Sequence, residues 1–452
     1  MTVQAYRFAL DPTPAQDRAL RSHCGAVRFA FNWGLSRVKA NLGQREAEKS
    51  YGLAGHDLTP ALSWSAYSLR KDWNAAKAQV APWWAENSKE AYSCGLANLA
   101  ASLANWKDCR TGKRKGARAG FPRHKNKHRA RLSCRFTTGP IRCESRHAVL
   151  PRLGRIKLHE RGDALAGKVT AGLVRVQSAT VVFERGRWFV SFTVQADRAP
   201  RTPARPGAVA GVDLGITVLA MLSDGTAVAN PRHLARALPK VRRLSRTVSR
   251  RRGPYDAATR RHRQPSKRWE CASARLSKAQ GRVADLRRDS IHKFTTALAR
   301  EYGTIVAEDL NIAGMVRNRR LARAIADAGW GEIRRQLSYK TKWNGGQLIV
   351  ADRWFASSKT CSGCGAVKAK LLLSERTYTC ATCGLVTDRD ENAARNLARY
   401  GEQLIAGSGP EINGRGADHK TTPVAQVAMK RQPGTAHAGK TGTVPPQDGT
   451  AP

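Results

Sequence analysis

The chain has 452 residues, enough for several domains, and carries 79 Lys and Arg against 34 Asp and Glu, a net charge of +45. The basic residues are spread along the chain, so a folded protein of this charge needs a polyanionic partner, and nucleic acid fits best. No apolar run approaches 18 residues, which excludes a membrane span. Of the ten cysteines, four are clustered and six are scattered, which is no disulfide scaffold and favours a reducing cytoplasm.

The N-terminal part predicts one strand followed by helices. Residues 3–10 alternate as a strand does, and Thr13 followed by Pro14 is typical of a helix start. A second helical region, about 60–107, begins its best helix at Asn87 or Ser88 and is rich in tryptophan: Trp64, Trp73, Trp83, Trp84 and Trp106. We expect these rings mainly in the core, with stacking on unpaired bases as the alternative.

Residues 107–131 form a basic segment with eleven Lys or Arg and one acid, interrupted by glycines. An aromatic residue stands inside it, in Phe121-Pro122-Arg123. A solvated linker is one interpretation, but the embedded aromatic favours a loop that contacts phosphates. The candidate contacts are Arg123, Lys125 and Lys127.

Residues 132–198 predict a set of β-strands, with a hairpin turn at 184–187. With the N-terminal strand, they indicate a split β domain into which the helical region is inserted. The next apolar run ends in Asp213, and two further short strands, 218–222 and 226–228, complete a meander.

Three acids stand at the ends of predicted elements. Asp213 ends one buried strand, Glu308 ends another, and Asp390 lies at the start of a helix. Carboxylates that converge in a folded sheet repel one another unless a cation lies between them, and Mg²⁺ prefers such oxygen ligands. Two Mg²⁺ ions about 4 Å apart could serve the attacking and leaving oxygens of a phosphodiester. For one acid alone, a solvated strand end is an equally good interpretation.

Residues 231–300 predict a helical hairpin with 21 Lys or Arg and four acids. An ordinary solvated helix face would mix in glutamates for ion pairs, and that mixture is missing. We therefore expect contacts with phosphates that carry no sequence information. The densest cluster is Arg242, Arg243, Arg246, Arg250, Arg251 and Arg252.

Two Cys-x-x-Cys pairs, each followed by glycine, stand fifteen residues apart: Cys361 with Cys364, and Cys380 with Cys383. Four thiolates at this spacing suit one tetrahedral Zn²⁺, and a closed four-ligand site is structural. Redox pairing is the weaker alternative in a cytosolic chain. The predicted ribbon, residues 358–386, interrupts the domain that carries the acids.

The run from Cys361-Ser-Gly-Cys-Gly365 to Asp388-Arg-Asp-Glu-Asn-Ala-Ala-Arg-Asn396 closely resembles the TnpB family of insertion-sequence proteins, which are related to type V CRISPR effectors. Further matches are Gly211-Val-Asp-Leu-Gly215, Ala307-Glu-Asp-Leu-Asn-Ile-Ala-Gly-Met315 and Gly120-Phe-Pro-Arg123. The resemblance covers roughly residues 3–405. It implies an RNA-guided DNA endonuclease with a guide RNA from the element's end and double-stranded target DNA as partners.

The resemblance also implies the fold class: an α/β multidomain protein with a ribonuclease H-like (RuvC) nuclease domain, an inserted zinc ribbon, and a split β-barrel-like wedge domain with an inserted helical domain. Its catalytic acids match Asp213, Glu308 and Asp390, with Asp390 preferred over Asp388. The expected cofactors are two Mg²⁺ and one structural Zn²⁺. We expect a bacterial cytoplasmic protein that is nucleoid-associated when bound to DNA. A monomer is favoured, but the sequence leaves a dimer open.

The expected boundaries are 1–12 and 118–200 for the wedge, 13–117 for the helical recognition domain, 201–357 and 387–405 for the nuclease, and 406–452 for a disordered tail. Two other functions remain open. The chain could be a transposase that acts directly on DNA ends without a guide RNA, using the same metal chemistry. It could also be a non-cleaving nucleic-acid-binding regulator, although the three intact acids disfavour this.

Overall fold

The computed structural model describes residues 2–114, 116–197, 201–258, 261–262, 265–372 and 374–407. They divide into two compact units, the first made of residues 2–20 and 131–407 and the second of residues 21–130. Over the described part of the chain, no helix combines the length and the apolar character that crossing a bilayer requires. The predicted disordered tail, 406–452, lies outside the described residues from position 408 onward.

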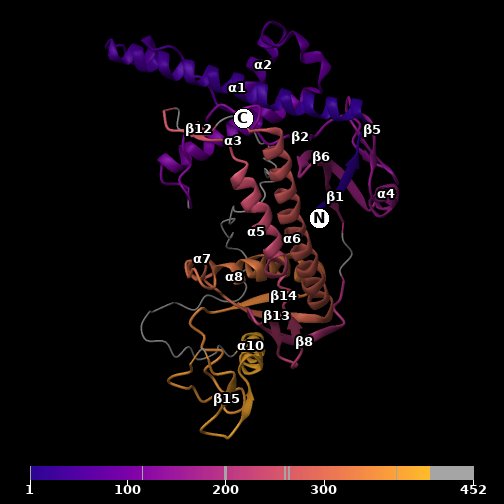
Figure 1. Cartoon of the computed structure of the whole chain (residues 1–452), viewed down its shortest axis with the longest axis vertical. Helices are drawn as coiled ribbons and strands as arrows, with labels where there is room; N and C mark the ends of the chain where they lie inside the picture. The colour runs from indigo at the N-terminus through magenta and orange to yellow at the C-terminus, as the bar shows by residue number, and fades with distance from the viewer. Residues whose placement is uncertain are drawn as a thin grey trace. The chain divides into compact units, whose positions relative to one another are not determined.

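The first unit contains an antiparallel seven-stranded sheet of order β2-β6-β7-β1-β5-β4-β3. Figure 1 labels four of its strands, β1, β2, β5 and β6. Its strands are β1 (Thr2–Asp11), β2 (Ser133–Phe136), β3 (Arg142–Cys143), β4 (His147–Leu150), β5 (Gly154–Leu158), β6 (Val174–Glu184) and β7 (Arg187–Ala196). The first strand of the chain lies between β7 and β5, in the interior of the sheet. The β6–β7 turn has positive φ at Arg185 and Gly186, which matches the tight hairpin predicted there.

The sheet does not close into the predicted barrel-like domain. Within the described residues it ends at β2 and β3, which pair only with β6 and β4. Alternation of apolar residues predicts strands but not whether the two edges meet, because closure depends on strand tilt and stagger. The structure also contains a helix that was not predicted, α4 (Asp163–Thr170), which packs against β6.

The second unit is helical. Its main elements are α1 (Pro14–Ser50), which begins in the first unit, α2 (Ala66–Val80) and α3 (Lys89–Arg110), with the short turns η1 (Gly55–Asp57) and η2 (Pro82–Glu86). Thr13 and Gln16 cap α1 reciprocally, and Ser88 caps α3. Trp73 is buried and its ring stacks on Tyr92, with the centroids 4.8 Å apart. For this tryptophan, the prediction of core packing is confirmed.

The second sheet of the first unit has five strands in the order β10-β9-β8-β13-β14. They are β8 (Arg205–Leu214), β9 (Val218–Leu222), β10 (Ala227–Ala229), β13 (Tyr302–Glu308) and β14 (Gln347–Ala351). β8, β13 and β14 run parallel to one another. β9 pairs antiparallel with β8, and β10 pairs antiparallel with β9, which is the predicted meander. A parallel strand must be covered on both faces, which explains why β8 and β13 read as nearly continuous apolar runs.

Helices cover both faces of this sheet. Ile305 of β13 belongs to a core with Leu298 of α6 (Lys267–Glu301) and Ile333 of α9 (Trp330–Trp343). The next residue, Val306, points to the other face, where it packs with Leu397 of α10 (Arg389–Ile405). This alternation places α10 against the face opposite α6 and α9.

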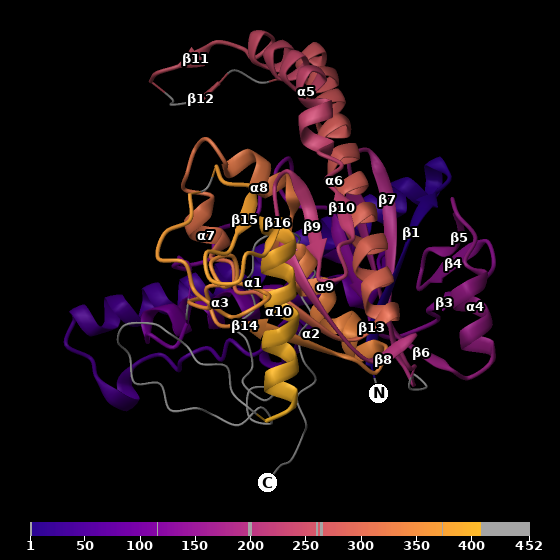
Figure 2. The same cartoon turned by 90° about the horizontal axis from the view of Figure 1, so that it is seen from below.

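α5 (His233–Arg250) and α6 form the predicted helical hairpin and lie side by side in Figures 1 and 2. A small unpredicted hairpin, β11 (Tyr255–Asp256) and β12 (Arg261–His262), joins them. The buried Asp327 of α8 (Ala322–Ala328) accepts hydrogen bonds from Leu234 N and from Arg287. It thereby ties the start of α5 to α6, and the short helix α7 (Ile312–Met315) precedes α8.

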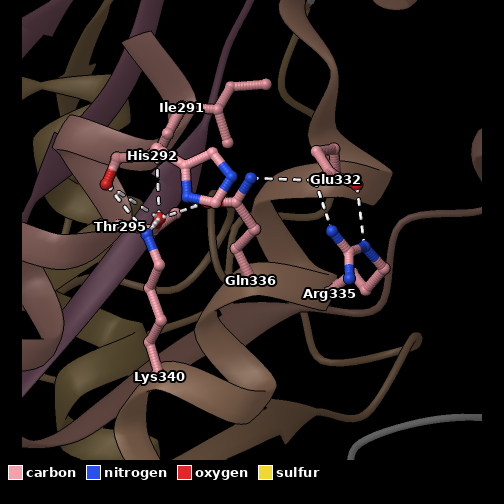
Figure 3. Close-up of polar contacts among 7 residues, drawn as sticks. All are labelled: Ile291, His292, Thr295, Glu332, Arg335, Gln336 and Lys340. Carbon is pink, nitrogen blue, oxygen red and sulfur yellow. Dashed lines mark hydrogen bonds and ion pairs between the residues drawn. The ribbon is translucent and has the colours of Figure 1, made fainter. Parts of the chain in front are cut away.

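A polar network joins α6 to α9 (Figure 3). The buried Lys340 donates to the His292 carbonyl at 2.8 Å and to the Thr295 hydroxyl at 2.7 Å. Gln336 lies 2.8 Å from that hydroxyl and donates to Glu332, which Arg335 also holds. Burial lowers the pKa of Lys340 to about 8, because the loss of solvent around the ammonium disfavours its charged form.

Candidate active site

The sheet brings two of the three acids together through strand register. β8 and β13 are parallel neighbours, and Val212 pairs with Ala307. Asp213 and Glu308 each follow that pair by one residue, so both carboxylates leave the sheet at the same edge. Asp390 is the second residue of α10, the helix that covers one face of the same strands.

The electrostatics of Asp213 show that Glu308 and Asp390 lie near enough to affect its carboxyl group. Its pKa is raised well above the usual range, first by burial and then by the charges of Glu308 and Asp390. Three acids with few counter-charges are unfavourable together, because each ionised group destabilises the others. A divalent cation bound among them would relieve this repulsion, so the donor set fits oxygen-preferring Mg²⁺.

Asp388 and Asp390 have different surroundings. Asp388 is the N-cap of α10, and its Oδ1 accepts from Asp390 N at 2.8 Å and Glu391 N at 3.1 Å. The Asp390 carboxylate instead lies 3.9 Å from the Arg376 guanidinium. Capping therefore occupies Asp388, which favours Asp390 as the third ligand, as the resemblance implied.

Sequence reasoning missed a serine that positions Glu308. The buried Ser357 donates its hydroxyl to Glu308 Oε1 at 2.5 Å. The neighbouring Asp309 is held by two guanidinium groups, Arg334 at 2.5 Å and Arg353 at 2.6 Å. Ser357 follows β14 by six residues in an irregular segment, so no periodic pattern could have identified it.

The four predicted cysteines come together in a small lobe with the strands β15 (Thr377–Thr379) and β16 (Val386–Asp388). Their sulfur atoms all lie within 4.8 Å of one another, and in the described residues this is the only such group of potential metal ligands. A backbone N–H of Cys383 lowers the pKa of the Cys380 thiol, whereas the pKa of the Cys383 thiol is raised by its contacts with the sulfurs of Cys364 and Cys361. Positive φ at Gly365 and Gly384 closes each knuckle.

Two asparagines of α10 fasten this lobe beside the acids. Asn392 accepts from Ser362 N at 2.9 Å and donates to the Thr360 carbonyl at 2.7 Å. Asn396 donates to the carbonyls of Ser357 and Thr360, at 2.8 and 2.6 Å. Both asparagines are buried, so the first cysteine knuckle and the Glu308–Ser357 contact rest on the helix that carries Asp390.

The lysines and arginines predicted to contact nucleic acid differ in how exposed their side chains are. Arg123 and Lys127 are exposed, but Lys125 is half-buried, with its Nζ 3.8 Å from the centroid of the Phe31 ring and its backbone N–H bonded to Asn32. Burial lowers the pKa of Lys125, and this packing disfavours a phosphate contact. The six arginines predicted on and after α5 are all exposed: Arg242, Arg243, Arg246, Arg250, Arg251 and Arg252.

Three family models match the chain. Residues 330–397 match a "Cas12f1-like, TNB domain", residues 189–319 a "Probable transposase", and residues 1–47 a "Helix-turn-helix domain". In the structure, the last of these ranges is occupied by β1 and most of the single long helix α1.

Relatives match over nearly the whole length. A "Putative RNA-guided DNA endonuclease" of Mycobacterium tuberculosis is 39% identical over 96% of this chain and 95% of its own. A protein of the same description from Streptomyces pristinaespiralis is 32% identical over 96% of this chain and 98% of its own. InsQ of Escherichia coli, also described as a putative RNA-guided DNA endonuclease, is 29% identical over 94% of this chain and 99% of its own. Among solved structures, a Cas12f1–sgRNA–target DNA complex matches with a TM-score of 0.47 and 11% identity, over 88% of this chain and 98% of that one.

Proposed function

Because the chain belongs to the TnpB family, we propose that it is an RNA-guided DNA endonuclease, encoded by a transposable element, that hydrolyses phosphodiester bonds of target DNA. The observation that carries this proposal is the strand register that brings Asp213 and Glu308 to the same end of two neighbouring parallel strands, with Asp390 at the start of the helix that packs on them. Near full-length similarity to relatives named for this activity supports it.

We assign a RuvC-like, ribonuclease H-type nuclease domain to residues 201–357 and 387–405, with the zinc ribbon at 358–386. Residues 1–12 and 118–200 are the wedge-like β domain, and 13–117 the helical recognition domain. The mixed sheet, with its parallel centre and helices on both faces, supports the nuclease assignment.

In this proposal Asp213, Glu308 and Asp390 hold two Mg²⁺ ions, and Cys361, Cys364, Cys380 and Cys383 hold one structural Zn²⁺. Bound Mg²⁺ supplies charge stabilisation at the attacking and leaving oxygens of the phosphodiester. Ser357 keeps the Glu308 carboxylate in one orientation, and the cap made by Asp388 sets where α10 begins and hence where Asp390 lies.

The partners are a guide RNA transcribed from the element's end and double-stranded DNA. A guide-dependent protein holds its heteroduplex mostly by the backbone, leaving sequence recognition to base pairing. The exposed arginines of α5 supply charge for that purpose without base-reading geometry.

The test compares substitutions of three carboxylates: Asp213, Asp390 and the neighbouring helix cap Asp388. Asp213→Ala and Asp390→Asn should abolish cutting of guided target DNA while RNA binding survives. Asp388→Asn should keep activity, because asparagine caps a helix as well as aspartate does. Asp289→Ala is the control, since Asp289 pairs with Lys293 on the surface of α6. Cutting by the Asp213 variant would refute the site.

One family model carries the description of a transposase, which keeps direct action on DNA ends as a second candidate. It would join DNA through the same acids, with a 3′ hydroxyl in place of water. Strand joining by the purified chain without any RNA would favour it over the guided nuclease. The absence of cutting with a matched guide and target would instead favour a non-cleaving regulator.

A further inference from the structure

The segment between β14 and the zinc ribbon carries a solvent-facing tryptophan beside the candidate active site. We propose that the ring of Trp354 stacks on an unpaired base of the DNA strand held at Asp213, Glu308 and Asp390, so that Trp354 positions the strand for cleavage. The inference rests on the proposed function for its substrate.

The chain around Trp354 forms a loop that is closed on Glu308. At one end, Ala351 is the strand partner of Glu308 in the β13–β14 ladder. At the other end, the Ser357 hydroxyl binds Glu308 Oε1 at 2.5 Å. Trp354 stands midway, three residues from each end. The backbone on both sides of Trp354 is therefore held at Glu308, one of the three acids.

The backbone of this loop is held by local contacts, while the ring itself is left in solvent. Trp354 N donates to Asp352 Oδ1 at 2.8 Å. The next residue, Phe355, packs on Tyr400 of α10, with the two ring centroids 4.8 Å apart. Yet Trp354 is 76% exposed, among the highest values for a large apolar residue in the described part of the chain. A large ring presented by a supported turn is suited to bind a flat partner with little loss of conformational entropy.

The exposed guanidinium beside the ring favours a nucleic acid over a protein partner. Arg353, the neighbour of Trp354 in the chain, contacts the carboxylate of Asp309, which Arg334 also contacts. The Arg353 side chain remains 49% exposed, so it can also approach a phosphate. An aromatic platform beside a cation is the usual arrangement for holding single-stranded nucleic acid, because every base offers a π-face.

Photocrosslinking tests the contact directly. The full-length chain is loaded with its guide RNA and with target DNA that carries 5-iodouracil at single positions across the cut site. After irradiation, the crosslinked peptides are identified by mass spectrometry. We expect a crosslink to Trp354 from one or two adjacent positions. Crosslinks that map to other aromatic residues and never to Trp354 would overturn the proposal.

Substitutions then measure what the stack contributes. Trp354→Ala and Trp354→Leu should slow single-turnover cleavage roughly tenfold, the size expected for losing one base–aromatic stack. Trp354→Tyr keeps a ring and should retain most of the rate. Equal rates for the Leu and Tyr variants would overturn the proposal, since an apolar surface alone would then suffice, as in a contact between proteins.

The crosslink needs no cleavage, so the two proposals fail in distinguishable ways. If wild-type chain never cuts but Trp354 still crosslinks to DNA, the nuclease assignment fails while the stacking contact stands. If wild-type chain cuts and neither the crosslink nor the rate depends on Trp354, only the stacking contact is wrong. Because the ring is exposed, its replacement should leave the fold intact, and equal melting temperatures of the variants verify this.

Discussion

Gly211 of β8 lies directly against the backbone of Ala394 in α10: a Cβ at Gly211 would stand 1.9 Å from the Ala394 carbonyl oxygen. The helix that carries Asp390 is thus seated on the strand that carries Asp213, with no side chain between them. Asp213 is two residues beyond the contact on β8. Any side chain at position 211 must therefore push α10, and Asp390 with it, away from the sheet.

Gly211→Ala should lower the stability of the first unit by about 1–3 kcal/mol, since the added methyl overpacks a backbone contact. It should also reduce cleavage, because the acids no longer converge. Thermal unfolding and single-turnover cutting measure the two effects. Gly207→Ala on the same strand is the matched control, as its Cβ would meet nothing within 4 Å. Wild-type activity in Gly211→Ala would contradict the close seating of α10.

Asn396→Ala should loosen the ribbon from α10 without emptying the metal site. It leaves the carbonyl of the buried Ser357 without this donor, a cost of about 1–3 kcal/mol, while the Thr360 carbonyl keeps its bond from Asn392. We expect normal zinc content by elemental analysis, together with reduced cleavage, because Ser357 orients Glu308.

The control for this change is Asn105→Ala, another helical asparagine that donates to a backbone carbonyl, but on the exposed surface of α3. It reports the effect of replacing a helical asparagine whose hydrogen bonds, to the Ala101 carbonyl and from Arg114, lie on the surface. If Asn396→Ala loses its zinc, the asparagine supports the metal site itself rather than its placement beside the acids.

The strands that end in Asp213 and Glu308 were predictable because buried parallel strands read as apolar runs, and the zinc lobe because four cysteines kept a metal spacing. The contacts that join these parts were not. Ser357 and Asn396 meet their partners only after the ribbon has folded back on α10, and nothing in their local sequence indicates it. The position of Lys125 was equally unpredictable, because nothing in the basic segment around it indicates that its side chain packs on Phe31.

Lys340 should make stability depend on pH in the alkaline range. Its pKa is about 8 in the folded chain, because of burial, against the usual value of 10.5. Between these values the unfolded chain holds a proton that the folded chain has released, so the free energy of unfolding rises as pH increases from about 8 to 10.5. Below pH 8 the contribution of this group is constant.

Lys340→Met should remove that part of the pH dependence, as measured by denaturant unfolding at a series of pH values. Lys342→Met is the matched control, because Lys342 lies on the same helix but outside the buried network. Between pH 8 and 10.5, the slope of the free energy of unfolding against pH should fall in the Lys340 variant and persist in the Lys342 control. Equal slopes in both variants would mean that Lys340 is solvated and that the network in Figure 3 is open to water.

The arginines of α5 should hold nucleic acid by charge alone. Replacing Arg242, Arg243, Arg246 and Arg250 with Gln should weaken binding of guide and target, without changing which target is chosen. For duplex DNA, the slope of log affinity against log salt should become shallower by about 0.9 for every phosphate that the variant no longer neutralises. The same four positions changed to Lys keep the charge, and should keep both affinity and slope. A shift in target preference in the Gln variant, with the slope unchanged, would show that α5 reads bases instead.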